Sequence, residues 1–234
     1  MTTHSNEYGQ PVGFPVPGWE ARPRPTETPM AGRYCHLERL DAARHAAQLF
    51  AAHSLAEDGR PWTYLPYGPF ADLASFESWA ADAATTQDPL FFAIVDGERG
   101  DATGVASYLR IDERMGSIEV GHLAYSPLLQ RTRAATEAMY LMMARAFDEL
   151  GYRRYEWKCD SLNEPSRQAA LRLGFQYEGE FRQATVYKGR NRNHHWFSIT
   201  DAEWPALKAG FEGWLDPSNF DEQGRQRTRL HGRG

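Results

Sequence analysis

Three consecutive segments near the middle of the chain are typical of β-strands: the first is a short continuous apolar run, and apolar and polar residues alternate in parts of the other two. The segments are 89–96, 102–112 and 117–126, and short turns containing Gly, Asp and Glu separate them. Because strands joined by short turns pair with each other in antiparallel fashion, the pattern predicts a three-stranded meander. The segment "RYCHLERL", residues 33–40, alternates in the same way and predicts one more strand before the meander.

Apolar residues recur at intervals of three and four in other segments, which predicts amphipathic helices. Helix-capping residues mark most of their ends. The predicted helices are 42–53 after Asp41, one opening at Asp72 or Ser75, 131–150, one capped by Asn163 or Ser161 and ending at Gly174, and 201–215.

Three further strands complete the pattern. One covers 152–159, and the last two cover 176–189 and 194–200 around the turn "RNRN". The predicted order is strand, two helices, three strands, helix, strand, helix and two strands, which is a mixed α/β chain. A helix connects 117–126 to 152–159, and such a crossover makes the two strands parallel neighbours.

The two ends of the chain differ from this pattern. Residues 1–32 are rich in proline, which predicts an extended arm. We expect Trp19, Phe14 and Val16 to hold the arm against the domain or a second subunit; a loose tail is the alternative. Residues 217–234 are polar and contain four arginines (Arg225, Arg227, Arg229 and Arg233), so we expect a solvated tail after a domain at 33–216.

Composition narrows the classes of function. The 234 residues carry a formal net charge of −5, which argues against general nucleic-acid binding. The two cysteines form no disulfide framework, and neither a signal peptide nor a membrane-length apolar run is visible. We therefore expect a cytoplasmic protein without a membrane partner. His194 and His195 lack companion carboxylates at metal-binding spacing, so no metal is predicted, and a surface turn is expected there.

The segment "SPLLQRTRAATEAMYLMM", 126–143, raises the possibility of an anion site. A strand ends there and a helix begins, and the first N–H groups of any helix lack partners and favour a negative charge. Arg131 and Arg133 add positive charge in the turn. The G-K-[ST] of a P-loop is absent. The alternative is a well-capped helix that begins with two solvated arginines.

Three motifs together resemble the GNAT superfamily of N-acetyltransferases, in particular the branch of the ribosomal-protein acetyltransferases RimJ and RimL. They are "SIEVGHLAYS" (117–126), "QRTRAATEAM" (130–139) and "NEPSRQAALRLGF" (163–175), and the resemblance covers about 33–201. It implies an α/β (α+β) fold with a mixed, mostly antiparallel central sheet, a splayed parallel strand pair and helices on both faces.

The resemblance implies acetyl-CoA as co-substrate. Backbone N–H groups at the start of the long helix would bind its pyrophosphate, and the splayed strand and the helix-capping asparagine would bind the pantetheine arm. Arg133 stands where the family has a small residue, which leaves these backbone donors in place. The cofactor-binding residues implied are Leu123, Ala124, Tyr125, Gln130, Arg131, Thr132, Arg133, Ala134, Ala135, Thr136 and Asn163.

Acetyl transfer requires a neutral amine. Deprotonation at pH 7 costs roughly 4–5 kcal/mol for a lysine and about 1 kcal/mol for an α-amine. Glu119 matches the glutamate of the branch motif and is the expected general base; the alternative is that it anchors substrate or pairs with an arginine. His122 is expected on the opposite face. Many family members protonate the thiolate with a tyrosine, but Ala170 occupies that position, so the resemblance implies Ser166 as donor.

Aromatic residues in 62–70, together with two residues from later strands, predict an acceptor pocket, although an aromatic cluster can equally belong to a core. We expect the acceptor to be an amine-bearing small molecule or a peptide or protein N-terminus, and a homodimer is possible. The alternative function is a non-catalytic acyl-CoA sensor or partner module. The predicted acceptor residues are Trp62, Tyr64, Tyr67, Phe70, Trp157 and Arg182.

Overall fold

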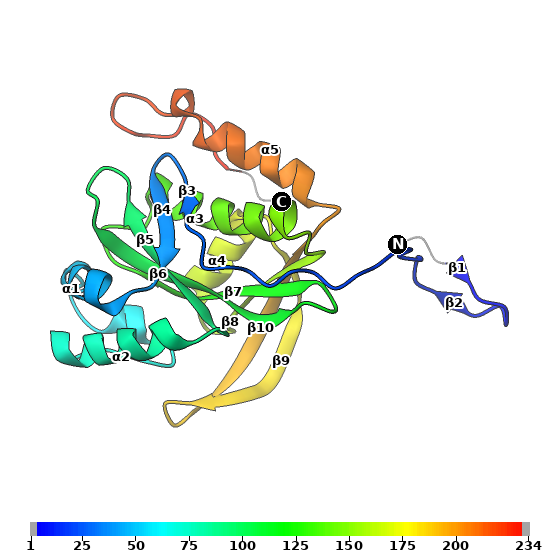
Figure 1. Cartoon of the computed structure of the whole chain (residues 1–234), viewed down its shortest axis with the longest axis horizontal. Coiled ribbons are helices and arrows are strands. Elements are labelled where there is room, and N and C mark those ends of the chain that lie inside the picture. Colours follow the sequence, from blue (N-terminus) through cyan, green and yellow to red (C-terminus); the bar gives the residue numbers. More distant parts are fainter. Residues whose placement is uncertain (1–3, 231–234) are drawn as a thin grey trace.

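A computed structural model describes residues 4–230, and its centre is one eight-stranded sheet (Figure 1). The strand order is β3-β4-β5-β6-β7-β8-β10-β9, and β5, β6 and β7 form the predicted antiparallel meander. A separate hairpin, β1 and β2, lies near the N-terminus. The strands are β1 (His4–Ser5), β2 (Pro11–Val12), β3 (Met30–Ala31), β4 (Cys35–Arg39), β5 (Leu90–Asp96), β6 (Ala102–Asp112), β7 (Ser117–Tyr125), β8 (Arg154–Asp160), β9 (Gln176–Tyr187) and β10 (Arg190–Thr200).

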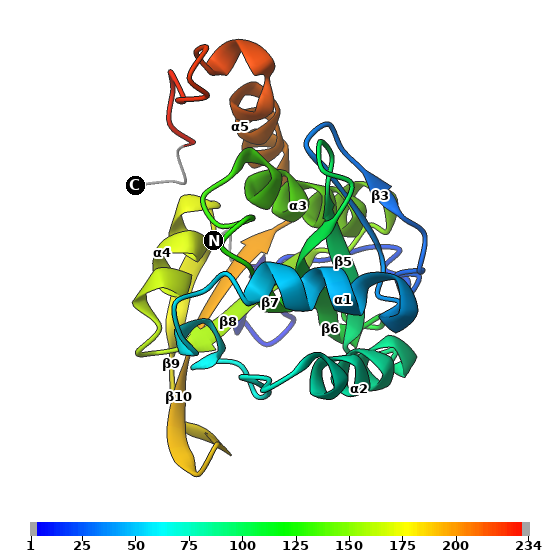
Figure 2. The same ribbon diagram turned by 90° about the vertical axis from the view of Figure 1, so that its left-hand side faces the viewer.

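Helices cover both faces of the sheet, which confirms the predicted fold class (Figures 1 and 2). Helices α1 and α2 lie on one face, and α3, α4 and α5 lie on the other. The predicted caps form: Asp41, Asp72 and Asn163 each accept a backbone N–H from the first turn of their helix. The helices are α1 (Ala42–His53), α2 (Leu73–Thr85), α3 (Arg133–Ala144), α4 (Glu164–Arg172) and α5 (Trp204–Leu215).

Strands β7 and β8 are the parallel pair of the sheet, as the crossover through α3 predicted. Their register runs from Ser117 opposite Arg154 to Val120 opposite Trp157 and then stops. Beyond Val120, β7 continues to pair with β6 alone. The sheet therefore opens between β7 and β8, next to the start of α3.

Two β-bulges flank the middle of β7. At one, Arg110 of β6 has φ 51°; at the other, His122 of β7 has φ 52°. Non-glycine residues rarely adopt this left-handed region, and each bulge adds one residue to its strand. Side chains beyond a bulge therefore lie on the face opposite to the one that simple alternation predicts.

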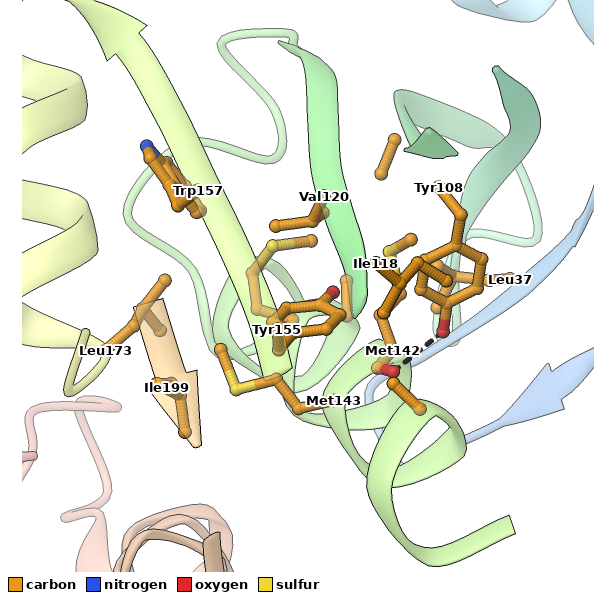
Figure 3. Packing of buried hydrophobic residues seen from close by; sticks show 14 of the residues in the cluster. Leu37, Tyr108, Ile118, Val120, Met142, Met143, Tyr155, Trp157, Leu173 and Ile199 are labelled. Carbon is orange, nitrogen blue, oxygen red and sulfur yellow. Dashed lines mark hydrogen bonds between the residues drawn. The ribbon is translucent and has the colours of Figure 1, made fainter. Parts of the chain in front are cut away.

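The larger core lies between the sheet and helices α3, α4 and α5 (Figure 3). Its side chains come from alternate positions of the central strands, such as Ile118 and Val120 of β7. Tyr108 donates its buried hydroxyl to the Met142 carbonyl at 2.7 Å and so ties β6 to α3. A second core under α1 and α2 contains Trp62, Phe76 and Phe91 and other buried residues.

The last hairpin differs from the prediction. The turn lies at Lys188 and Gly189, with φ 47° and 71°, and β10 already begins at Arg190. Two consecutive positive φ values define the type I′ turn that suits the twist of a two-residue hairpin, whereas "RNRN" was predicted as the turn. His194 and His195 therefore lie in β10, and His194 is buried, so the predicted surface turn is wrong at these positions.

The N-terminal arm is extended, and its hairpin projects beyond the body (Figure 1). Trp19 holds the arm: its indole N–H donates to the Arg114 carbonyl at 2.8 Å, and its ring lies against Gly116. Phe14 and Val16 are exposed, so they do not hold the arm against the domain of the same chain. Residues 1–3 of the predicted arm lie outside the described residues.

The C-terminal segment folds back on the domain at a few positions, whereas Arg225, Arg227 and Arg229 are exposed, as expected for a solvated tail. Asn219 is buried and donates to the carbonyls of Trp214 and Thr228. Leu230 packs against the larger core. Residues 231–234 of the predicted tail, including Arg233, lie outside the described residues. Between residues 4 and 230, no helix is long and apolar enough to cross a membrane.

Candidate active site

Glu119 is a buried carboxylate at the centre of β7. It is 2% exposed, and its Oε2 lies 3.2 Å from Nε of Arg110 and 3.5 Å from Nζ of Lys158. Burial raises the pKa of Glu119 to about 7, although the two cations pull it down. A carboxyl group with this pKa changes protonation state near neutral pH, which is the property required of a general base.

Lys158 reaches Glu119 because of the parallel register. Glu119 lies opposite Glu156 of β8, and Lys158 is two residues further along the same strand, so its side chain is on the same face. Its ammonium also lies 5.2 Å from the ring centre of Trp196 in β10. Burial lowers the pKa of Lys158, and the nearby Arg110 adds to this effect. Neither Lys158 nor Trp196 was among the residues predicted for the site.

Arg110 approaches Glu119 from the other side, and its guanidinium lies 5.0 Å from the Trp196 ring centre. Its neighbour Leu109 pairs directly with Glu119, so alternation would turn Arg110 to the opposite face. The bulge at Arg110 reverses this and brings the guanidinium to the carboxylate. The sequence pattern did not reveal this residue because the bulge is not visible in it.

His122 also lies on the face that carries Glu119, so its predicted position on the opposite face is wrong. Its ring is stacked with Tyr67 at 5.7 Å and makes an edge contact with Phe91 at 5.0 Å. The reason is the bulge at His122 itself, which shifts the alternation of β7. Burial and the nearby cations Lys158 and Arg192 lower its pKa to about 4, so the ring is neutral at physiological pH.

The predicted aromatic pocket divides into a site part and a core part. Tyr67 reaches the site through its contact with His122, and Tyr64 donates its hydroxyl to the Leu162 carbonyl at 3.1 Å, beside α4. Trp62 is buried, and Phe70 packs edge-on against it, with ring centres 5.2 Å apart. The core alternative therefore holds for Trp62 and Phe70.

Two predicted acceptor residues lie elsewhere. Trp157 is buried in the larger core (Figure 3). It is adjacent to Lys158 in β8, so its side chain lies on the face of the sheet opposite to Lys158 and Glu119. Arg182 is exposed on β9. The residue before it, Phe181, contacts Trp196 with ring centres 5.1 Å apart. Phe181, and not Arg182, therefore points from β9 toward the Glu119 side of the sheet. The assignments of Trp157 and Arg182 to the acceptor pocket are wrong.

The turn before α3 presents free backbone donors. Thr132 caps the helix: its hydroxyl accepts the N–H of Ala135 at 3.1 Å. The N–H groups of Arg133 and Ala134 have no acceptor in the described part of the chain. Arg131 has φ 62°, and the Gln130 amide donates back to the Tyr125 carbonyl at 2.8 Å. This arrangement fits an anion at the helix start.

Other residues predicted around this turn already have partners within the chain. The Arg133 guanidinium packs over the rings of Tyr34 and Phe220, at 4.6 and 4.9 Å, so the solvated-arginine alternative is wrong for it. The Thr136 hydroxyl accepts from Arg172 at 3.2 Å. Ala124 and Tyr125 pair with β6, and Leu123 packs on the larger core. All three lie in the part of β7 that does not pair with β8.

Ser166 lies in the first turn of α4. Its hydroxyl oxygen accepts the indole N–H of Trp157 at 3.1 Å, and its backbone N–H donates to the Asn163 side chain at 3.2 Å. Because the indole supplies a proton to the oxygen, the hydroxyl proton of Ser166 is left to be donated elsewhere, and a side-chain hydrogen bond links Ser166 to Cys159. Within residues 4–230, no group of three or more His, Cys, Asp or Glu side chains is placed to hold a metal ion.

Comparison with known proteins gives a consistent result. The family model described as "Acetyltransferase (GNAT) domain" matches residues 36–176. A GCN5-related N-acetyltransferase from Brucella melitensis is 47% identical, with a TM-score of 0.90, and the match covers 92% of this chain and 97% of that one. A protein described as a probable acetyltransferase (GNAT family) from Chromobacterium violaceum is 42% identical, with a TM-score of 0.77 and coverage of 84% and 98%.

A more distant structure shares the fold alone. The microcin C7 self-immunity acetyltransferase MccE, in complex with acetyl-CoA and AMP, is 18% identical, with a TM-score of 0.60 and coverage of 72% and 93%. No curated protein matches the chain.

Proposed function

The chain belongs to the GNAT family of N-acetyltransferases, and we propose that it transfers acetyl from acetyl-CoA to a primary amine, with Glu119 as general base and Ser166 as proton donor. The observation that carries the proposal is the buried Glu119 carboxylate, which has a pKa of about 7 and lies in the last paired residues of β7, just before the sheet opens. The acceptor is the amine of a small molecule or of a peptide N-terminus.

The start of α3 is the binding site that we assign to the coenzyme A pyrophosphate. The free N–H groups of Arg133 and Ala134 support this assignment, because such donors and the helix dipole favour an anion. The uncovered stretch of β7 and the cap residue Asn163 flank the path that the pantetheine arm would follow. Acetyl-CoA supplies the acetyl group as a thioester, which is activated toward attack by an amine.

The protein residues move two protons in this scheme. Glu119 takes a proton from the acceptor amine, so that the nitrogen lone pair becomes available. Ser166 gives its hydroxyl proton to the thiolate sulfur that leaves, and the second proton that the nitrogen loses as the amide forms restores the hydroxyl. The Trp157 indole keeps the Ser166 oxygen in place and acts as a positioning residue. Family membership and the ionisable buried carboxylate both argue against the alternative of a non-catalytic acyl-CoA module.

The test is release of free thiol from acetyl-CoA in the presence of amines. A panel of small primary amines and short peptides with free N-termini should give amine-dependent thiol release and an acetylated product of the expected mass. Peptides blocked at the N-terminus and lacking lysine are the matched control and should give none. Tight binding of acetyl-CoA without amine-dependent release across the panel would instead favour the non-catalytic module.

A further inference from the structure

We infer that Arg110 is a specificity residue that binds an anionic group of the acceptor, and that the acceptor is a primary amine carrying a carboxylate or similar anion on or next to the amine-bearing carbon. The inference rests on the proposed function, because it concerns the acceptor side of the same site. It follows from the way Arg110 is held, from its free donors and from the charge around it.

Arg110 is held in a costly conformation. Its φ of 51° lies in the left-handed region. Glycine adopts this region readily, whereas it is strained for other residues. Asp88 caps the bulge: its two carboxylate oxygens accept the N–H groups of Arg110 and Ile111 at 2.8 and 3.1 Å. The fold therefore contains a dedicated support for this bulge, and the effect of the bulge is to turn the Arg110 side chain toward Glu119.

The Arg110 guanidinium is only partly used. Its Nε forms an ion pair with Glu119, and no acceptor within residues 4–230 takes a hydrogen bond from the guanidinium. The side chain is 51% exposed, whereas Glu119 beside it is almost completely buried. The Trp196 ring supports one side of the guanidinium. The two terminal nitrogens are thus free to form the planar, two-pronged contact that suits a carboxylate or phosphate.

The surroundings favour an anion. The stretch from 181 to 200, which makes most of the β9–β10 hairpin, contains four Arg or Lys residues and no Asp or Glu. Arg182 lies away from Glu119, whereas Arg192 lies near the site, 3.9 Å from Asp160, and the acidic Glu156 acts on Glu119 from β8. The hairpin projects beyond the rest of the sheet (Figures 1 and 2). A site with Lys158 and Arg110 beside its base repels a simple protonated amine, and an anion on the acceptor compensates for this repulsion.

Geometry limits where the anion can be. Arg110 contacts Glu119 directly, so an amine within reach of the Glu119 carboxylate has the guanidinium as a close neighbour. An anion one or two bonds from the amine carbon can therefore meet Arg110 while the amine meets Glu119. An α-amino acid has this arrangement, whereas the N-terminus of a peptide has an uncharged amide in the same place.

The test compares rates per neutral amine for pairs that differ by the α-carboxylate, because this group also lowers the pKa of the amine: tyrosine with tyramine, tryptophan with tryptamine, and leucine with 3-methylbutylamine. We expect kcat/KM to favour the carboxylate member of at least one pair by about tenfold or more, as for a charge-assisted hydrogen bond. In Arg110→Gln this ratio should fall to within about twofold of unity. The ratio is insensitive to any change in the Glu119 pKa, because both members of a pair use the same base.

Arg99→Gln is the control, because it removes the same charge from an exposed turn and should keep the wild-type ratio. O-phosphotyramine carries its anion far from the amine. A preference for it over tyramine, without one for tyrosine, would place the anion site in the hairpin and overturn the role of Arg110. Turnover of uncharged amines without a carboxylate preference, or an unchanged ratio in Arg110→Gln, would also overturn the inference and leave acetyl transfer standing. Absence of turnover with every amine, peptides included, would overturn both.

Discussion

The Lys158 ammonium lies 3.5 Å from the Glu119 carboxylate, and both side chains are largely removed from water. The pair combines opposing effects: burial raises the pKa of Glu119, and Lys158 is the strongest of the influences that lower it. The balance places the pKa at about 7. Activity that depends on ionised Glu119 should therefore rise with pH and level off above this value.

Lys158→Met removes the cation and keeps most of the side-chain volume. Because the ammonium stabilises the ionised carboxylate, its loss raises the pKa of Glu119 further, and the acidic limb of kcat/KM should move to higher pH by about one to two units. Much of the rate should return at pH 9. Lys208→Met, in a surface ion pair on α5, is the control and should leave the limb in place. An unmoved limb in Lys158→Met would show that the lysine does not tune the base.

Ser166→Ala removes the proposed proton donor. We expect kcat to fall by about 10- to 100-fold at every pH, with little dependence on the basicity of the amine, and the Kd of acetyl-CoA to stay within about twofold. Trp157→Phe should give part of the same loss, because the hydroxyl then lacks its indole partner. Ser161→Ala, just before α4, is the matched control. A normal kcat in Ser166→Ala would mean that another group or water protonates the thiolate.

Two substitutions at Arg133 separate the contribution of its backbone N–H group to coenzyme A binding from that of its side chain. Arg133→Ala removes the guanidinium, which packs on Tyr34 and Phe220, and keeps the N–H group. Arg133→Pro also removes the N–H group, and proline is well tolerated at the first position of a helix after an extended residue such as Thr132. Calorimetry should show coenzyme A binding about tenfold weaker in the proline variant than in the alanine variant. Equal Kd values would exclude this N–H as a phosphate ligand.

Trp19 is expected to attach the arm to the domain. Trp19→Ala removes a hydrogen bond and a half-buried ring, which should lower the free energy of unfolding by about 2 kcal/mol and Tm by about 4–8 °C. Phe14→Ala, at a side chain that is 58% exposed, should leave Tm unchanged. Calorimetry of the two variants distinguishes an attached arm from a loose tail. If the arm is a loose tail, neither substitution changes Tm.

Much of the fold follows from local patterns in the sequence. Periodicity located the helices and the meander, and capping residues such as Asp72 and Asn163 marked helix starts where the structure has them. The parallel pair followed from the helix between β7 and β8. The alternation in "YEWKCD" also indicated that Trp157 faces the core, because its neighbours Glu156 and Lys158 are charged and lie on the opposite face. The polar positions of this strand, and not its tryptophan, indicated the site.

The rest of the site depends on features that a single sequence does not display. Arg110 and His122 reach Glu119's face because of bulges, and neither bulge contains the glycine that would signal one. The C-terminal segment returns to Arg133 through a turn around the buried Asn219, and nothing in its polar composition indicates this contact. These placements result from tertiary contacts, which override the local pattern.

The central claim is that Glu119 is the general base, and the pH dependence of Glu119→Gln tests it most directly. With an α-amine acceptor, we expect kcat/KM of Glu119→Gln at pH 7 to fall by about 10²–10³. The acidic limb near pH 7 that reports the titration of Glu119 should disappear from the pH profile. Much of the rate should return at high pH, where the amine is already neutral. Acetyl-CoA affinity should be unchanged. If the variant instead keeps kcat and the wild-type limb and raises only the KM of the acceptor, Glu119 is a substrate anchor and the account is wrong.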